Sequence, residues 1–479
     1  MPDVVIVGAG VAGCACAREL SRYNLDVEVV EAGYDLACGA SRSNSGIVHG
    51  GYDPKPGTRK AYYNVRGAQR IFELAPELGF RVRRNGSMVV AFSEEELKVI
   101  EELMRRAQAN GVSDVRVVGA EQARTLEPNL NPKVMGALVC DASGICDPFG
   151  MTVAFAENAK VNGVTFRFLT PVVDIKKEPC GWGVQLGTGE VLHTKLLINA
   201  AGVQAIEFHN KVSEDKLISR PRLGEYVLMS RDMGTTFSHT MFQTPTSRGK
   251  GVLVSPTTEG NLIVGPDALD STDAFDTATH SEGLAAVIEQ AKLTWPTYAA
   301  GEVITNFAGV RPSGANGDFV IGEVEDAPGF YDIAAFDSPG LTSAAAVAVD
   351  VAAWAADKLN ATLNSSFIPQ RACPKRFLEM TKEEREVAIA QDPLFGHLVC
   401  RCEQVSEAEV LEAIHAPIPA TTISAVRRRC RAGMGRCQGG FCLPTVAEII
   451  ARETGIDIGD VRMAGPGSEI GLGHIGEVE

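Results

Sequence analysis

The strongest constraint on the fold lies within the first 31 residues. An apolar strand, "DVVIV", runs into the glycine pattern Gly8-x-Gly10-x-x-Gly13. A helix and a second apolar strand, "VEVV", follow, and the strand ends at Glu31. In such a pattern the first glycine permits a tight turn, the second lets backbone N–H groups approach a pyrophosphate, and the third lets the helix lie close to the strand. The segment predicts a Rossmann-type unit that binds a dinucleotide, with phosphate at the helix N-terminus and Glu31 on the ribose hydroxyls.

Composition narrows the class of protein. A chain of 479 residues, 45% of them hydrophobic, is long enough for two or three domains and a large core. The net charge of −15 argues against nucleic acid or an anionic membrane as the main partner. No apolar run reaches the roughly 18 residues of a membrane span, because Asp350 interrupts the longest one.

The N-terminus and the cysteines bear on location. The stretch "VVIV" already forms the first strand, so we expect no signal peptide and a cytoplasmic protein, with contact to a membrane only through a partner. Thiols stay reduced in that compartment, so the twelve cysteines are expected to be packing residues or metal ligands instead of disulfides.

Two later segments favour FAD over NAD as the dinucleotide. The first, "LLINAAGVQ" at 196–204, is a buried strand that ends in Ala-Ala-Gly. The second, at 329–359, is a strand, a Ser-Pro-Gly turn and a long helix. Its turn sets the backbone amides of Gly340, Leu341 and Thr342 at a helix N-terminus, where they stabilise negative charge on a reduced flavin ring. An ordinary strand-to-helix crossover is the alternative.

Ordered landmarks then support a family resemblance. They are "SNSGIVHGGYDPKPG" after the fingerprint, "GKGVLVSPTTEGNLIVGPDALD", "FAGVRP" and "DSPGLTSA". With them, residues 1 to about 360 resemble the FAD-dependent glycerol-3-phosphate dehydrogenases and oxidases of the D-amino-acid-oxidase-like superfamily. The L-2-hydroxyglutarate oxidases are similar too, around "NSGIVH". The resemblance implies an α/β flavoenzyme in residues 1–365.

The implied architecture has two interleaved domains. Strand-like stretches such as "GSMVVAF" and "GEYVLMS" suit a largely antiparallel sheet over the flavin. We predict a Rossmann-type FAD domain from residues 1–85, 145–215 and 320–365, and an antiparallel-sheet substrate domain from residues 86–144 and 216–319.

The stretch "SGIVHGG" sets His49 among small and apolar residues. Oxidising a secondary alcohol requires removal of the hydroxyl proton while hydride leaves the same carbon, and a neutral imidazole with a pKa of about 6.5 is a competent base for it. We predict that His49 is the general base, the role that the resemblance also assigns to it. The alternatives are a hydrogen-bonded core histidine and a histidine covalently bonded to the flavin.

A phosphorylated substrate requires cations. Arg311 offers a planar fork and Lys250 a point charge, and both lie in motifs that match the phosphate-contacting positions of the family. Solvated surface cations are the alternative. We also count Ser338 among the candidate catalytic residues. Ser338 and Ser45 are both expected to contact the flavin or the backbone. The resemblance implies this set of cofactor contacts: Gly8, Gly10, Val11, Ala12, Gly13, Glu31, Ala32, Asn44, Ser45, Gly46, Val173, Ala200, Gly202, Gly340, Leu341 and Thr342.

Four cysteines stand out near the C-terminus. A charged, helical connector within residues 366–395 leads to Cys400-x-Cys402, and Cys437 and Cys442 follow. Glycines around the second pair let backbone amides face the sulfur atoms, which helps to hold an anionic cluster. Zinc is the alternative, although structural zinc sites more often use Cys-x-x-Cys knuckles.

The same segment resembles the bacterioferritin-associated-ferredoxin-like domain, a small helical module with a 2Fe-2S cluster. The resemblance implies that residues 396–455 form this domain, with a tail over 456–479, and that these four cysteines are its ligands. Cys430 falls where no ligand is expected. The segment also contains a basic run: Arg427, Arg428, Arg429, Arg431 and Arg436. These arginines could offset the charge of the cluster, dock an acidic electron-transfer partner or form a solvated helix face, and the sequence leaves the three roles open.

Together these features predict an FAD-dependent oxidation of sn-glycerol 3-phosphate to dihydroxyacetone phosphate. Electrons are expected to leave through the 2Fe-2S cluster to an electron-accepting protein subunit, since a simple oxidase has no need of a cluster. The alternatives are a dehydrogenase or oxidase for L-2-hydroxyglutarate, one for amino acids or amines, and, in another class, an iron–sulfur electron carrier or iron-mobilising regulator.

Overall fold

The N-terminal glycine pattern follows a central strand of a six-stranded sheet with the order β20-β21-β13-β1-β2-β9. The computed structural model describes residues 1–245, 251–373 and 375–471. The strands are β1 (Val4–Val7), β2 (Val27–Val30), β9 (Thr165–Arg167), β13 (Leu196–Asn199), β20 (Val320–Glu323) and β21 (Phe330–Ala334). All pair in parallel except β20 with β21. Parallel strands are covered on both faces, which explains their continuous apolar sequences.

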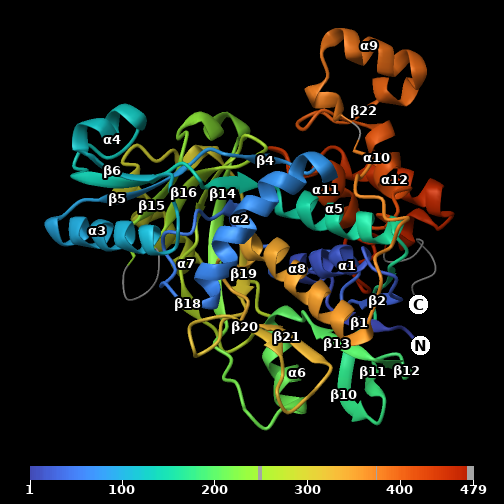
Figure 1. The fold of residues 1–479 in the computed structure, drawn as a ribbon. Helices are drawn as coiled ribbons and strands as arrows, with labels where there is room; N and C mark the ends of the chain where they lie inside the picture. Colours follow the sequence, from blue (N-terminus) through green and yellow to red (C-terminus); the bar gives the residue numbers. More distant parts are fainter. Residues whose placement is uncertain (246–250, 374, 472–479) are drawn as a thin grey trace.

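Helices cover one face of this sheet and a small sheet covers the other (Figure 1). The helices are α1 (Val11–Leu20), α2 (Arg59–Leu78), α5 (Pro148–Val161) and α8 (Gly340–Leu359), with α1 packed between α8 and α5. All of α1 is buried, and its small Ala, Gly and Cys side chains allow this close approach. The other face carries β10 (Val172–Glu178), β11 (Gly181–Leu186), β12 (Val191–Thr194) and α6 (Ala205–Val212).

A second, mostly antiparallel sheet of nine strands lies beside the first, on the left in Figure 1. Its strands are β5 (Ser87–Ala91), β6 (Val115–Gly119), β7 (Gly136–Cys140), β14 (Arg222–Met229), β15 (Thr240–Gln243), β16 (Leu253–Pro256), β17 (Leu262–Gly265), β18 (Leu269–Asp270) and β19 (Val303–Arg311). It packs against α3 (Glu94–Ala109), α4 (Ala120–Leu126) and α7 (Ser281–Thr294). A three-stranded sheet contains β3 (Ile47–Val48), β4 (Val82–Arg83) and β8 (Gly144–Cys146). The predicted combination of a Rossmann-type sheet with an antiparallel sheet is confirmed, while the domain boundaries stay predictions.

The C-terminal domain, from β22 onward, is small and helical. It contains β22 (Leu398–Cys400), β23 (Val405–Ser406), α10 (Glu407–Ile414), α11 (Ile423–Cys430) and α12 (Leu443–Thr454) around a hydrophobic core of its own. The charged connector before it forms α9 (Lys382–Gln391), as expected, and this helix projects at the top of Figure 1. Among the described helices, none is both long and apolar enough to cross a membrane.

The arginine run of α11 fixes this domain to the rest of the chain. Arg428 and Arg429 both bind the carboxylate of Asp35, at 2.7 and 2.9 Å, and all three side chains are about 95% buried. Arg436 pairs with Glu302 at 3.3 Å. Since these partners lie in the preceding parts of the same chain, most of the basic run serves docking within the molecule instead of a solvated face.

Glu259 is the centre of a second, buried contact among three parts of the molecule. It lies after β16 and binds Arg376 of the connector at 2.8 Å, Arg431 of the C-terminal domain at 3.3 Å, and Arg81. Burial raises the pKa of its carboxyl, but the charges of Arg431, Arg376 and Arg81 outweigh burial and bring the pKa to about 2. One carboxylate thus neutralises arginines from separate segments.

We expect Glu259→Gln to destabilise the whole chain by roughly 3–5 kcal/mol, because Arg376 loses the carboxylate that it binds, and Arg431 and Arg81 keep only Glu403 and Glu379 of their carboxylate partners. Chemical denaturation would measure the loss. The exposed pair of Glu289 and Lys292 supplies the control, and Glu289→Gln should cost no more than about 1 kcal/mol. Equal denaturation midpoints for the two variants would contradict the central role of Glu259.

The wild-type chain should also show the matching pH dependence. Because a pKa of about 2 lies below the value of about 4.3 in an unfolded chain, the Glu259 contacts stabilise the fold fully above pH 4.3. Their contribution is lost as the pH falls from there toward 2, and Glu259→Gln should lack this component.

Candidate active site

A cavity of about 1490 Å³ is lined by residues of both large sheets. Ordinary small-molecule sites measure about 300–1,000 Å³, so this one has room for a dinucleotide and a small substrate together. Glu31 and Val172 line it near the parallel sheet, and His49, Arg311 and Ser338 line it near the second sheet.

The turn after β1 accepts no side chain. Gly8 has φ +103°, and a Cβ there would lie 2.5 Å from the carbonyl oxygen of Ala200. A Cβ on Gly13 would lie 1.9 Å from the carbonyl oxygen of Gly8. The backbone of α1 therefore begins against the sheet edge, and Gly10, Val11 and Ala12 at its start line the cavity. This geometry fits a pyrophosphate.

Glu31 ends β2 at the same edge. Its carboxylate accepts hydrogen bonds from the N–H groups of Ala9 and Gly33, both at 2.7 Å. Burial raises the pKa of Glu31, and the two amide hydrogen bonds oppose that shift. The carboxylate is thus held rigidly beside the glycine turn, where a ribose can reach it.

Most of the predicted cofactor contacts line this cavity: Gly8, Gly10, Val11, Ala12, Glu31, Ala32, Asn44, Ser45, Ala200, Gly202, Gly340 and Leu341. Four others, Gly13, Gly46, Val173 and Thr342, are not among the lining residues. The side chain of Val173 is half exposed, and the preceding Val172 lines the cavity in its place. The alternation of sides along β10 separates these two neighbours. Lys250 lies outside the described residues.

His49 follows β3 and is held through its backbone. Its N–H donates to the hydroxyl of Thr342 at 3.0 Å, and that hydroxyl donates to the carbonyl of Ile47 at 3.1 Å. The side chain of Asn64 donates to the carbonyl of His49. These contacts from α8 and α2 fix the main chain, while the half-buried imidazole lines the cavity with its Nε2 3.4 Å from the Ser338 hydroxyl. Thr342 therefore positions His49.

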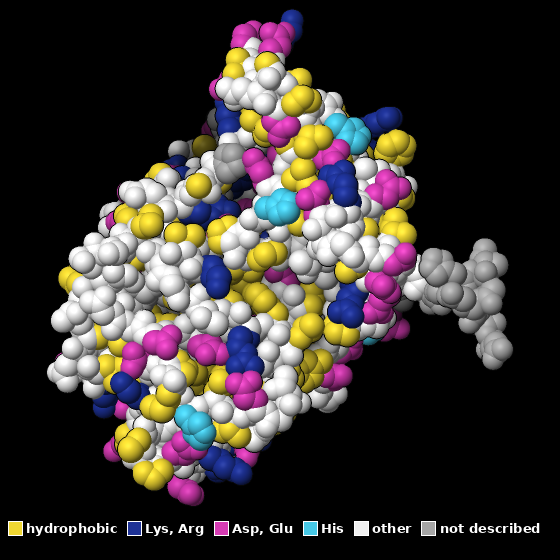
Figure 2. All heavy atoms as spheres, turned by 90° about the vertical axis from the view of Figure 1, so that its right-hand side faces the viewer, with side chains coloured by type: hydrophobic (Ala, Val, Ile, Leu, Met, Phe, Trp, Pro, Cys, Tyr) yellow, Lys and Arg dark blue, Asp and Glu magenta, His cyan; other side chains and the backbone are white. Residues whose placement is uncertain are grey.

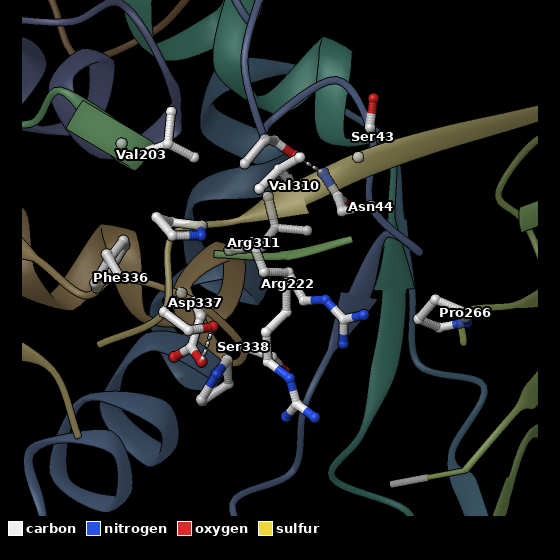
Figure 3. A pocket seen from close by; sticks show the side chains of 18 of the residues that line it. Ser43, Asn44, Val203, Arg222, Pro266, Val310, Arg311, Phe336, Asp337 and Ser338 are labelled. Carbon is white, nitrogen blue, oxygen red and sulfur yellow. Dashed lines mark hydrogen bonds between the residues drawn. The ribbon is translucent and has the colours of Figure 1, made fainter. Parts of the chain in front are cut away.

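Two arginines face each other across β14 and β19. Arg222 and Arg311 are direct partners in the antiparallel pairing, and both project into the cavity (Figure 3). One nitrogen of Arg311 donates to the carbonyls of Leu223 at 2.9 Å and Asp267 at 2.6 Å, so the guanidinium plane is fixed. Arg222 pairs with Asp270, which is 92% exposed. Like charges directly opposite each other in a sheet repel, and an anion between them removes that cost.

Sequence reasoning missed Arg222. The residue stands just before the predicted strand "GEYVLMS" and more than 80 positions from Arg311. Only the register of β14 against β19 brings the two together, and the local sequence contains no signal of that register.

The four C-terminal thiols form two pairs. The sulfur atoms of Cys402 and Cys437 lie 3.8 Å apart. Cys400 lies against Cys442, whose thiol lowers the pKa of Cys400 to about 6. Backbone amides also face the sulfur atoms, those of Gly433 and Glu403 toward Cys400 and those of Gly439 and Phe441 toward Cys437.

This arrangement suits a cluster of two metal ions. A tetrahedral zinc would draw all four sulfur atoms together, whereas a 2Fe-2S cluster takes two thiolates on each iron. The thiol pairs and the amides around them therefore fit an iron–sulfur cluster.

Comparisons with known proteins agree with both sites. Residues 3–354 match the family model of the FAD dependent oxidoreductases, and residues 398–452 match that of the BFD-like [2Fe-2S] binding domain. A glycerol 3-phosphate dehydrogenase of Caloramator mitchellensis is 41% identical over 473 residues, 98% of each chain. A glycerol 3-phosphate oxidase of Mycoplasma pneumoniae is 34% identical over 353 residues, 72% of this chain and 92% of that one.

A solved structure supports the fold and the cofactor. The reduced L-alpha-glycerophosphate oxidase from Mycoplasma pneumoniae with FAD bound matches with a TM-score of 0.74 and 32% identity, over 78% of this chain and 99% of that one. The expectations of FAD instead of NAD and of a 2Fe-2S domain instead of a zinc site are thereby confirmed.

Cysteine substitutions should separate ligands from packing residues. We expect Cys402→Ser to lower the iron and acid-labile sulfide content of the purified protein by at least half. Cys430→Ala is the matched control in the same domain, because Cys430 is buried and its thiol donates to the carbonyl of Val426. That variant should keep full iron content, and loss of iron in it alone would refute the predicted ligand set.

Proposed function

The chain belongs to the family of FAD dependent oxidoreductases, and we propose that it oxidises sn-glycerol 3-phosphate to dihydroxyacetone phosphate. The observation that carries the proposal is the content of one cavity, in which an imidazole and two facing guanidinium groups meet the glycine turn of the dinucleotide site. This set matches a substrate with a hydroxyl to deprotonate at one end and a phosphate dianion at the other.

His49 acts as the general base in this proposal. The bound FAD supplies the hydride acceptor. The alcohol proton passes to Nε2 of His49 as the hydride leaves the carbon, which requires a neutral imidazole at a fixed place. Thr342 and Asn64 fix its backbone, and the Ser338 hydroxyl, 3.4 Å from Nε2, lies beside the nitrogen that receives the proton. The position of the ring in the cavity favours this role over that of a core histidine.

Arg311 and Arg222 bind the phosphate. Arg222 can offer two parallel N–H donors to phosphate oxygens, Arg311 adds the donors of its other nitrogens because its Nη2 already binds two carbonyls, and the two positive charges together balance the dianion. Arg311 is fixed by two carbonyls before the substrate arrives, so little side-chain entropy is lost on binding. Lys250 remains a predicted third cation.

Electrons then leave one at a time through the iron–sulfur domain to an electron-accepting protein. Four thiols suited to a cluster and the rigid docking of their domain support this route over a direct reaction with oxygen. The same argument disfavours a bare iron carrier or regulator, which would have no use for the large cavity and its base.

Anaerobic flavin bleaching tests the proposal directly. The protein should lose its yellow absorption with sn-glycerol 3-phosphate, and much more slowly with glycerol, L-2-hydroxyglutarate or sarcosine. Faster bleaching by L-2-hydroxyglutarate would assign the protein to that substrate, and no bleaching by any of the four would reject the proposal.

His49→Gln should lower turnover by about 100-fold or more, the scale of a lost general base, with FAD content unchanged. His415→Gln is the control, because His415 is an exposed histidine paired with Glu453 in the C-terminal domain. Turnover of His49→Gln within a few-fold of the control would remove His49 from the mechanism.

Arg222→Met should raise KM for glycerol 3-phosphate by about 10-fold or more, as expected for a lost charge-assisted hydrogen bond, and change kcat little. Arg116→Met is the control in the same sheet, since Arg116 is a surface residue paired with Asp141. The loss should vanish with glycerol, which carries no phosphate. A KM equal to that of the control would exclude Arg222 from the phosphate site.

A further inference from the structure

The four thiols of the cluster site divide into a buried and an exposed pair. Cys400 and Cys442 are 2% and 1% exposed, whereas Cys402 and Cys437 lie open at the surface. Since the exposed sulfur atoms are 3.8 Å apart, the site has one edge in solvent and one edge in the protein.

The buried edge points back into the chain. The guanidinium of Arg427 lies close enough to interact electrostatically with both Cys442 and Tyr34, and Tyr34 precedes the Asp35 that anchors α11. Cys38, on the same loop, lines the large cavity. Because Asp35 of this loop binds α11, the buried side of the cluster site lies toward the loop that also lines the dinucleotide site.

Two exposed arginines and an exposed aromatic ring lie beside the exposed pair of thiols. Arg401 stacks its guanidinium over the ring of Phe441, 4.6 Å from the centroid, and Phe441 is 61% exposed. Arg436 stands next to Cys437, and its side chain is 64% exposed although it pairs with Glu302. We call this patch the exit face: Arg401, Cys402, Arg436, Cys437 and Phe441.

We propose that the exit face is the docking site of an electron-carrier protein whose redox centre is surrounded by acidic residues. In each transfer, one electron leaves the reduced cluster for the oxidised centre of the carrier, and no bond forms or breaks. Two transfers account for the two electrons of one alcohol oxidation. This inference rests on the proposed function only for the source of the electrons.

Charge favours an acidic carrier over other occupants. The chain has a net charge of −15, and on the side viewed in Figure 2 charges of both signs are interspersed without a large basic area. An acidic protein is therefore repelled by the molecule as a whole and attracted at the exit face, mainly by Arg401, because Glu302 partly balances the charge of Arg436; this difference orients the encounter. If two copies of this chain met through their exit faces, the arginines of one copy would lie against those of the other. An exposed aromatic ring with an arginine beside it is also typical of interface anchors.

The fixed position of the C-terminal domain supports the same route, from the buried thiols to the exit face. Its ion pairs with Asp35 and Glu259 are buried, so the domain stays docked while the carrier binds. Electrons enter at the inner edge and leave at the outer one, and a swinging motion of the domain is unnecessary.

The test uses the intact holoprotein, reduced with dithionite and freed of excess reductant, so that no substrate is involved. Its rate of electron transfer is measured by stopped flow with cytochrome b5, whose haem edge is acidic, and with cytochrome c, whose haem edge is basic. For the wild type we expect faster transfer to cytochrome b5, and that rate should fall as salt is added. A rate to cytochrome b5 that rises with salt would overturn the proposal.

Arg401→Glu should lower the rate to cytochrome b5 by about 10-fold or more and leave the rate to cytochrome c equal or higher. Arg452→Glu introduces the same charge change at the far end of α12 and should keep wild-type rates with both probes. Unchanged rates to cytochrome b5 in Arg401→Glu, with the cluster intact by its visible spectrum, would refute the exit face.

Calorimetric titration of the oxidised protein with cytochrome b5 gives a readout without turnover. Binding should weaken in Arg401→Glu and in Phe441→Ser, and persist in Arg452→Glu. Because neither measurement needs glycerol 3-phosphate, a negative result here leaves the proposed oxidation standing, and a failed flavin bleaching leaves the exit face standing.

Discussion

The contact between the turn after β1 and the end of β13 is the constraint on which the site depends. Gly8 passes so close to Ala200 that no Cβ fits, and Gly13 lets α1 rest on that same turn. The approach leaves the first turn of α1 open toward the large cavity, with Glu31 held by main-chain amides at its side. The base and the two arginines come from distant segments, yet they converge because the first turn of α8 and the end of β19 lie at the same opening.

Apolar packing and buried charge together join the parts of the molecule. Ile418 of the C-terminal domain lies in the core beside the parallel sheet, and carboxylates that each bind several arginines make further contacts between the parts. Buried ion pairs stabilise little in net terms, but they tolerate few geometries. The ion pairs of Asp35 and Glu259 therefore fix the position of the C-terminal domain relative to the cavity. The arginine run, for which three roles seemed open, serves mainly this purpose.

Local patterns predicted much of the molecule. The glycine turn, the acid that follows it, the histidine between small residues and the cysteine pairs are each contained in short segments, and their chemistry depends on spacing along the chain. What the sequence could not provide was register. Arg222 meets Arg311 only through the pairing of β14 with β19, and Val172 lines the cavity while Val173 does not, because a strand alternates its sides. The partner of Arg428 lies almost 400 residues away along the chain. The sequence alone therefore does not distinguish arginines on the solvent-exposed surface from arginines that bind another part of the same chain.

The loop between β2 and β3 has a wider consequence. Within five residues it contains Glu31, which lines the large cavity, and Asp35, which binds two arginines of the C-terminal domain. One short loop therefore contributes to both the large cavity and the docking of the C-terminal domain. An insertion or deletion between Glu31 and Asp35 would disturb both at once.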